Sequence, residues 1–304
     1  MPEKTIRVRV PGTTANCGPG FDTIGIACNI YNELELTLRK EEKLTIEISG
    51  EGAGNIPCDS RNIVWRSIQH LLGKANVEYK GAYIKMRNNV PLSRGLGSSA
   101  AAIVAGLKAA NVALGNPFNR REVFQMATEL EGHPDNVAPA IFGGVTISVV
   151  ENGQPECLSF IPKIPLRLIV AVPEFSLSTR SARNVLPEMV PLKDAIFNIS
   201  RASLLVAALC RGDTRHLRHA FEDMIHQPYR AKLIPGMYDV FEAAKNAGAL
   251  GACMSGAGPC LIAFATEGGD AIGASMVTAF SANEVKAKYL LLTIDNRGVH
   301  IIKD

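Results

Sequence analysis

The chain has 304 residues, of which 47% are hydrophobic and 20% are charged, and its formal net charge is +3. This length exceeds the usual size of one domain, and the apolar content excludes an intrinsically disordered chain. Because the net charge is small and the basic residues are dispersed, we expect neither a nucleic acid nor a membrane as a partner. Seven cysteines without a Cys-x-x-Cys pair, with no secretory leader and no apolar run of membrane-spanning length, indicate a cytoplasmic protein.

Alternating apolar residues predict a first strand at Ile6–Val10, and a loop at 11–25 follows it. The loop contains four glycines and two prolines, which is more than a simple connector needs. Loops held by a rigid scaffold carry functional residues more often than other segments do. Asn16 and Asp22 are therefore candidate binding residues. The alternative is a structural turn in which both side chains bond to their own backbone.

Two strands and a helix are predicted next. Alternation predicts strands at Leu34–Leu38 and Leu44–Ile48, and the charged residues between them predict a hairpin turn. Ser60 is a suitable N-cap for a helix that runs to Lys74. Asn62 in its first turn is a candidate contact for the base or ribose of a nucleotide, and a solvent-facing asparagine is the alternative.

A glycine turn at 91–101, Pro-Leu-Ser-Arg-Gly-Leu-Gly-Ser-Ser-Ala-Ala, joins a strand predicted at Tyr83–Val90 to an apolar helix predicted at Ala100–Leu114, with Ser98 or Ser99 as N-cap. The free N–H groups and dipole of a helix N-terminus attract anions, and glycines let a phosphate approach the backbone. The turn lacks the lysine of a P-loop and the later acidic residue of a dinucleotide site. It therefore predicts a phosphate-binding loop, with a serine-capped helix start as the alternative.

A polar cluster follows the helix predicted at Arg120–Leu130. Glu131, His133, Asp135 and Asn136 lie within six positions. Such oxygen and nitrogen groups can hold a divalent cation and position a substrate. Their spacing does not match the His-x-x-x-His pattern of a zinc site, so zinc is not expected. The alternative is a solvated helix end that is capped by Asp135.

The second half predicts a separate domain. Asn152-Gly153, after a strand predicted at Val145–Val150, signals a hairpin turn, and we divide the chain there into residues 1–153 and 154–304. Further predicted elements are a buried strand at Leu166–Val172, helices at Ala195–Gly212, Thr214–Met224 and up to Ala247, a strand at Cys260–Phe264, a helix at Ala271–Phe280, and strands at Tyr289–Ile294 and Val299–Ile302.

Two segments of this half carry further candidate residues. Thr179, Arg180 and Arg183 can hold a carboxylate or a phosphate, and surface arginines are an equally weighted alternative. A second glycine turn at 248–259 allows close approach of the backbone, either to a neighbouring loop or to the phosphates of a ligand.

Three of these segments, 11–25, 91–101 and 251–259, resemble in order the three motifs of the GHMP kinases, the superfamily of galactokinase, homoserine kinase, mevalonate kinase and phosphomevalonate kinase. Within it, Thr-Ala-Asn-Cys-Gly-Pro-Gly-Phe-Asp (14–22), Glu-Gly-His-Pro-Asp-Asn-Val-Ala-Pro (131–139) and Thr-Arg-Ser-Ala-Arg-Asn-Val-Leu-Pro (179–187) are most similar to homoserine kinases. The resemblance implies an α+β fold with an N-terminal ribosomal-protein-like domain, a C-terminal ferredoxin-like domain and an active site between them.

The resemblance also implies an activity and its residues. The activity is ATP-dependent phosphorylation of the L-homoserine hydroxyl to O-phospho-L-homoserine, a step of threonine biosynthesis, with Mg²⁺ held by Ser99 and Glu131. The implied catalytic residues are Ser99, Glu131, Thr179 and Arg183. The implied ATP-binding residues are Asn62, Pro91, Leu92, Ser93, Arg94, Gly95, Leu96, Gly97, Ser98, Ser99, Ala100 and Ala101. The implied substrate-binding residues are Asn16, Asp22, His133, Asn136, Arg183, Arg230, Ser255 and Gly256.

Within that set, Arg183 and Arg230 are expected to bind the substrate's carboxylate and Asp22 its ammonium group, and a homodimer is expected. Since no lysine accompanies Asp135, we expect the δ-hydroxyl to attack in line and its proton to pass to the γ-phosphate. Asp135 as a base is the alternative. Two other functions remain open: a kinase of another small alcohol such as mevalonate or shikimate, and a non-catalytic nucleotide-binding sensor.

Overall fold

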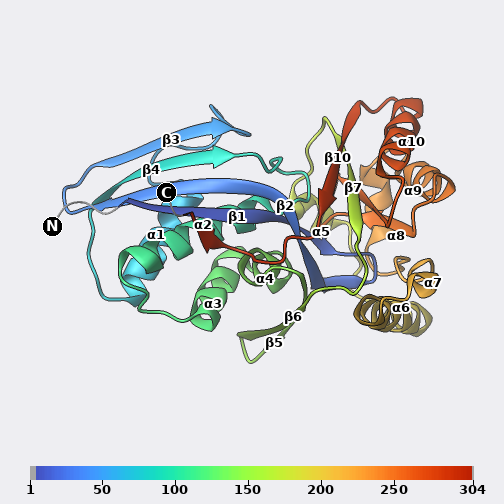
Figure 1. Cartoon of the computed structure of the whole chain (residues 1–304), viewed down its shortest axis with the longest axis horizontal. Helices are drawn as coiled ribbons and strands as arrows, with labels where there is room; N and C mark the ends of the chain where they lie inside the picture. Colours follow the sequence, from blue (N-terminus) through green and yellow to red (C-terminus); the bar gives the residue numbers. More distant parts are fainter. Residues whose placement is uncertain (1–4, 303–304) are drawn as a thin grey trace.

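The computed structural model describes residues 5–302, which form two layered units side by side (Figure 1). The first unit is a seven-stranded sheet with four helices on one face. Its strands are β1 (Thr5–Asn16), β2 (Gly20–Arg39), β3 (Leu44–Gly50), β4 (Gly81–Asn88), β5 (Val145–Glu151), β6 (Gln154–Phe160) and β11 (His300–Ile301). Its helices are α1 (Ile63–Lys74), α2 (Ser98–Ala113), α3 (Arg120–Glu131) and α4 (Pro134–Phe142).

Side-chain alternation along β1 decides which face of this sheet is buried. Ile6, Val8 and Val10 point into the apolar core beneath the helices. Arg9, between them, points to the other face, where it pairs with Glu33 across the neighbouring strand. The hydrophobic effect therefore covers one face with helices, and cross-strand ion pairs occupy the solvent face.

The long strand β2 organises the sheet, because it pairs with β1, β4 and β5. The hairpin predicted between Leu34–Leu38 and Leu44–Ile48 is wrong, since β4 lies between β2 and β3. β3 instead pairs in parallel with β4, and α1 supplies the crossover that a parallel pair requires. The alternation identified both strands correctly but carried no information on their partners.

Several predicted boundaries also change. The loop at 11–25 is mostly strand, because β1 continues to Asn16 and β2 begins at Gly20, with two register shifts between them. Asn62, not Ser60, caps α1, and Gly97 occupies the cap position of α2 instead of a serine. The helix predicted at Thr214–Met224 shortens to α7 (Thr214–Leu217).

The second unit is a four-stranded antiparallel sheet in the order β10-β7-β9-β8. Its strands are β7 (Arg167–Pro173), β8 (Gly251–Met254), β9 (Leu261–Ala265) and β10 (Ala287–Thr293). Its helices are α5 (Thr179–Asn184), α6 (Leu192–Arg211), α7, α8 (Gln227–Arg230), η1 (Ala231–Leu233), α9 (Met237–Asn246) and α10 (Gly269–Ala282). With α9 and α10 as the two helices, β7-α9-β8-β9-α10-β10 has the order of a ferredoxin-like fold, as expected.

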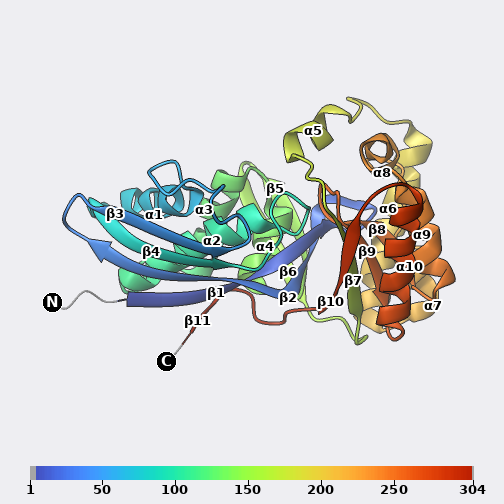
Figure 2. The same ribbon diagram turned by 90° about the horizontal axis from the view of Figure 1, so that it is seen from above.

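Opposite faces of this second sheet belong to different cores. Val170 of β7 packs in a cluster with α6, whereas its neighbours Ile169 and Ala171 pack with α9 and α10. The α9–α10 side is the outer edge of the molecule, as Figure 2 shows. The cluster that contains α6 also holds Ile24 and Ile26 of β2, so it joins the two units.

The predicted hairpin turn at Asn152-Gly153 is confirmed, because β5 pairs with β6 across it. Both strands belong to the first sheet, and β11 returns to that sheet from the end of the chain. We therefore propose that the domain boundary lies after β6, at 161–166, rather than at residue 153. Within 5–302, no helix is long and apolar enough to cross a membrane.

Candidate active site

A cavity of about 230 Å³ lies where the two units meet. It brings together most of the candidate residues from distant parts of the chain, and several that were not candidates. The lining residues are Asn16, Asp22, Ser93, Gly95, Gly97, Ser98, Ser99, Glu131, His133, Asp135, Asn136, Leu177, Ser178, Thr179, Arg183, Arg230, Gly256, Ala257 and Gly258. The phosphate-binding loop, the polar cluster and the two arginines thus share one space.

The N-terminus of α2 opens into this cavity. Gly97 occupies the cap position at a φ of 66°, and no side chain caps the helix. A Cβ at Gly97 would lie 1.9 Å from the Thr13 Oγ1 atom, so only glycine fits. Since Gly97, Ser98 and Ser99 line the cavity, the unpaired N–H groups of the first turn are available to an anion.

Three glycine-containing loops are fastened to one another around Gly95. The Thr13 amide donates to the Leu96 carbonyl oxygen at 3.0 Å. The Ser255 hydroxyl lies 2.6 Å from the Gly95 carbonyl oxygen and 2.9 Å from the Thr14 hydroxyl. A Cβ at Gly95 would lie 2.0 Å from the Ser255 carbonyl oxygen, so the second glycine turn sits directly against the first. These contacts hold the predicted phosphate-binding loop against the other two loops.

Ser99 and Glu131, the predicted magnesium ligands, are adjacent. The Ser99 hydroxyl donates to a Glu131 carboxylate oxygen at 2.8 Å. Burial raises the pKa of Glu131, and the Ser99 hydrogen bond and the nearby His133 partly offset that rise. Hydroxyl and carboxylate oxygens suit Mg²⁺, which usually takes its remaining ligands from water and substrate phosphates. Among residues 5–302, no group of three or more His, Cys, Asp or Glu side chains can hold a metal by itself.

The opposite side of the cavity is cationic. Arg183 donates to both carboxylate oxygens of Asp22, at 2.8 and 3.0 Å. Arg230 is only 2% exposed, and burial followed by the charge of Arg183 lowers its pKa to about 10. Both guanidinium groups lie over the Phe21 ring, at 5.6 and 5.2 Å from its centroid. Two neighbouring guanidinium groups at a cavity wall suit an anionic group such as a carboxylate.

The wall between these two sides is formed by the start of α4. His133 Nδ1 lies 2.5 Å from a carboxylate oxygen of Asp135, whose exposed fraction is 2%. Burial alone would lower the pKa of His133, but the hydrogen bond and charge of Asp135, with Glu131 and Asp22, raise it. Asn136 accepts from the Thr13 hydroxyl at 2.8 Å, which orients its amide NH₂ group independently of a ligand.

Asn16 connects the first and third loops. Its amide donates to the Gly256 carbonyl oxygen at 2.8 Å, and its oxygen accepts from the Asp22 amide at 3.0 Å. Asn16, Cys17 and Asp22 all have positive φ values, at 70°, 46° and 55°. Such conformations are costly outside glycine and are typical of functional loops. Asn16 therefore supports its own turn, as the alternative interpretation expects, and it also binds a distant loop.

Other candidate residues lie away from the cavity. Asn62 is fully buried, where it caps α1 through the Val64 amide and donates to the Pro57 carbonyl oxygen. Arg94 is bonded to the Pro173 and Glu174 carbonyl oxygens. The remaining residues of this kind do not line the cavity; they are Pro91, Leu92, Leu96, Ala100, Ala101 and Ser255. We expect them to support the predicted phosphate-binding loop from behind.

Sequence reasoning missed Leu177 and Ser178, which line the cavity. Ser178 had a detectable signal, because its hydroxyl caps α5 by accepting from the Ser181 amide at 3.0 Å. The cap presents the neighbouring Thr179 to the cavity. Leu177 carries no polar group, so no chemical pattern could have indicated it.

Comparison with known proteins gives consistent matches. Residues 62–144 match the GHMP kinases N terminal domain, and residues 205–281 match the GHMP kinases C terminal domain. A homoserine kinase of Carboxydothermus hydrogenoformans is 44% identical over 291 residues, covering 96% of this chain and 95% of that protein. A homoserine kinase of Moorella thermoacetica is 44% identical over 295 residues, covering 97% and 99%.

A crystal structure of homoserine kinase from Cytophaga hutchinsonii has a TM-score of 0.91 to this chain at 34% identity. The match covers 99% of this chain and 98% of that one. Sequence and fold therefore agree over nearly the whole length. The chain belongs to the homoserine kinase family of the GHMP kinases.

Proposed function

We propose that the cavity transfers the γ-phosphoryl group of ATP to the δ-hydroxyl of L-homoserine and forms O-phospho-L-homoserine. One observation carries this assignment: a helix N-terminus that suits phosphate and a pair of arginines that suits a carboxylate line the same cavity. An amino acid bound by its carboxylate at Arg183 and Arg230 would reach toward the phosphate end with its side chain. Family membership supports the same substrate.

We further propose that Mg²⁺ binds between Ser99, Glu131 and the ATP phosphates. The donor set fits this hard cation, and a cation would relieve the cost of a buried Glu131 carboxylate. When bound, the metal would neutralise charge on the transferred group. The N–H groups of α2 and the Thr179 hydroxyl supply the remaining stabilisation, and positioning does most of the catalytic work.

We propose that Asp22 binds the substrate ammonium and that Arg183 holds Asp22 in place. The bidentate ion pair fixes the carboxylate at the cavity wall before substrate arrives. Asp135 is a further acid at the site, and its carboxylate is engaged by His133. We therefore retain in-line attack with proton transfer to the γ-phosphate, with Asp135 as base as the alternative that Asp135→Asn would test.

The remaining proposals concern the setting of the reaction. We place the enzyme in the cytoplasm, within threonine biosynthesis, because all seven cysteines are unpaired, which suits a reducing compartment. We expect a homodimer from family membership, and sedimentation equilibrium tests it directly.

The experiment measures ADP release from MgATP with L-homoserine, D-homoserine, mevalonate or shikimate, in wild type and in Arg183→Ala. We expect turnover only with L-homoserine, and we expect Arg183→Ala to raise the KM for this substrate. Equal turnover of mevalonate or shikimate, which lack the ammonium that Asp22 would bind, would overturn the substrate assignment. ATP binding without turnover of any alcohol would favour the sensor function.

A further inference from the structure

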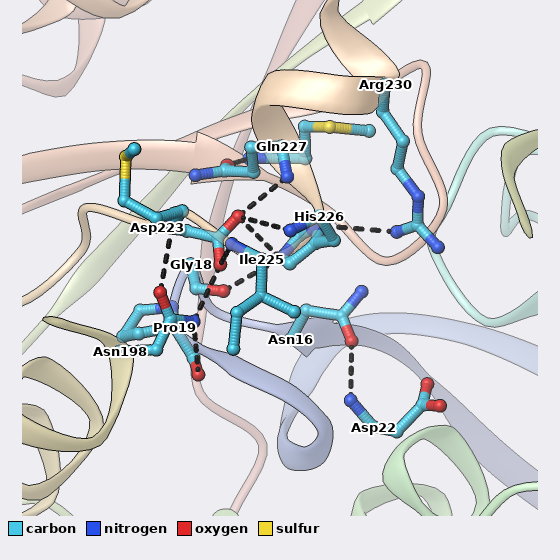
Figure 3. Close-up of polar contacts among 12 residues, drawn as sticks. Asn16, Gly18, Pro19, Asp22, Asn198, Asp223, Ile225, His226, Gln227 and Arg230 are labelled. Atoms are coloured by element: carbon cyan, nitrogen blue, oxygen red, sulfur yellow. Dashed lines mark hydrogen bonds and ion pairs between the residues drawn. The ribbon is translucent and has the colours of Figure 1, made fainter. Parts of the chain in front are cut away.

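A buried polar network lies behind Arg230, beyond the residues that line the cavity (Figure 3). Its centre is Asp223, whose carboxylate accepts from the amides of Ile225, His226 and Gln227 and from the Asn198 side chain. Asp223 and His226 are both buried. Polar groups at this depth are costly unless they are fully hydrogen-bonded, so such a network rigidifies whatever it holds.

The hydrogen bonds of His226 determine its tautomer. Its Nε2 atom lies 2.8 Å from the Gly18 carbonyl oxygen, which can only accept, so Nε2 carries the proton. Burial lowers the pKa of His226, and of the charged groups facing it Asp223 and Asp22 raise the pKa, whereas Arg230 lowers it further. The Nη1 group of Arg230 can only donate and lies 3.3 Å from Nδ1, so Nδ1 is the acceptor and the ring is neutral.

That acceptor faces Arg230. The Nη1 group of Arg230 lies 3.3 Å from His226 Nδ1 and 3.4 Å from the Gly256 carbonyl oxygen, and its Nε group donates to the Ala182 carbonyl oxygen at 3.0 Å. Within residues 5–302, the Nη2 group makes no hydrogen bond, and Arg230 lines the cavity. Three protein acceptors thus occupy the Nε and Nη1 groups and leave the Nη2 group for a ligand.

We propose that His226 is a positioning residue of this kinase: as a neutral acceptor it fixes Arg230 so that the free Nη2 group of the guanidinium meets the substrate carboxylate. Phe21 supports the arrangement, because it stacks on the His226 ring at 5.0 Å and lies under both guanidinium groups. The inference rests on the proposed function, which places the carboxylate at Arg183 and Arg230. This hydrogen bond holds the Arg230 guanidinium beside the like charge of Arg183.

Two matched variants separate this role from simple packing. In His226→Gln, the side-chain amide replaces Nε2 and can still donate to Gly18, but Arg230 loses its acceptor. In His226→Asn, the amide oxygen replaces Nδ1 and can still accept from Arg230. We expect His226→Gln to raise the KM for L-homoserine about tenfold, the loss typical of a charge-assisted hydrogen bond, and His226→Asn to raise it about threefold. The KM for ATP should change less than about twofold in both, because the phosphate loop is untouched.

A double-mutant cycle tests whether His226 acts through Arg230. In an Arg230→Met background, we expect His226→Gln to change the kcat/KM for L-homoserine by less than about twofold. Additive losses would overturn the proposal, and so would equal effects of the Asn and Gln variants or a parallel rise in the KM for ATP. Any of these results would leave the proposed function intact, whereas a wild type inactive on L-homoserine would refute the function itself.

A measurement on the unaltered protein covers the case in which a variant does not fold. NMR of wild type with ¹⁵N-labelled histidine should show the His226 ring neutral, with a proton on Nε2 and none on Nδ1, at the pH of the assay. A proton on Nδ1 would overturn the proposal, since His226 could then not accept from Arg230.

Discussion

Replacing Gly97 by alanine should damage the phosphate-binding loop in a way that can be calculated from the structure. The residue has a φ of 66°, and an alanine in this left-handed region costs about 1–2 kcal/mol. The added Cβ would also lie 1.9 Å from Thr13 Oγ1 and 3.0 Å from Asn136 Oδ1, so these groups must separate. Loss of their mutual hydrogen bond costs about 1 kcal/mol more, which gives a total of about 2–3 kcal/mol.

Gly115, just beyond the other end of α2, provides a matched control. Its φ is 84°, but no atom lies within 4 Å of an added Cβ. Gly115→Ala should therefore cost only the backbone penalty of about 1–2 kcal/mol. Because the control leaves the α2 N-terminus in place, only Gly97→Ala should also weaken the binding of ATP.

The assay combines urea unfolding, followed by circular dichroism, with separate measurements of the KM for ATP and for L-homoserine. We expect Gly97→Ala to raise the KM for ATP by about tenfold or more, the loss of one charge-assisted hydrogen bond, and Gly115→Ala to leave it unchanged. Equal stabilities together with an unchanged KM for ATP in both variants would refute the reasoning, since neither the clash nor the phosphate contact would then exist.

Glu131→Gln should raise the Mg²⁺ concentration required for half-maximal activity by about tenfold or more, because even residues that only support a metal ligand typically cost this much metal affinity. An unchanged Mg²⁺ titration would contradict the proposed metal site. Asp22→Asn should lower the kcat/KM for L-homoserine about 10–100-fold, with the KM for ATP unchanged, because a charged partner of the ammonium is lost. The pKa of His133 is raised in the folded state above its ordinary value of 6.5. Its ion pair with Asp135 therefore stabilises the fold fully at pH values below 6.5, and this stabilisation is lost as the pH rises through the raised pKa. In urea unfolding, the free energy of unfolding of wild type should therefore exceed that of His133→Gln by more at pH 6 than at pH 9. A difference that does not depend on pH would exclude the ion pair.

The sequence identified the cavity well because its chemistry sits in locally constrained segments. Gly97 stands in a motif that predicts a turn, Ser99 in one that predicts a helix start, and Glu131 in a cluster that can supply oxygen ligands. These requirements are local, so a reader of the sequence can state them without knowing the partners. Arg183 was a candidate from the residues themselves, against an equally weighted surface alternative. Arg230 needed the family resemblance, since an arginine on a short helix looks like a surface residue from sequence alone.

Long-range partnerships were not readable from the sequence. The alternation of β3 was correct, but its pairing with β4 depends on the crossover by α1. Asn62 looked like a free polar side chain, yet its amide is fully occupied by capping α1. Asp223 lies in the helix predicted at Thr214–Met224 and His226 just beyond it, and nothing in that pattern indicates their burial. Only the tertiary fold buries them, against Gly18 and Asn198.

The assignment of the cavity is tested most directly by a crystal structure of the protein with Mg²⁺, a non-hydrolysable ATP analogue and L-homoserine. We predict the γ-phosphate at the N–H groups that follow Gly97, the metal between Ser99 and Glu131, and the substrate carboxylate at Arg183 and Arg230. The δ-hydroxyl would then face the γ-phosphorus in line with the leaving oxygen. L-homoserine bound outside this cavity, or with its carboxylate away from both arginines, would contradict the account.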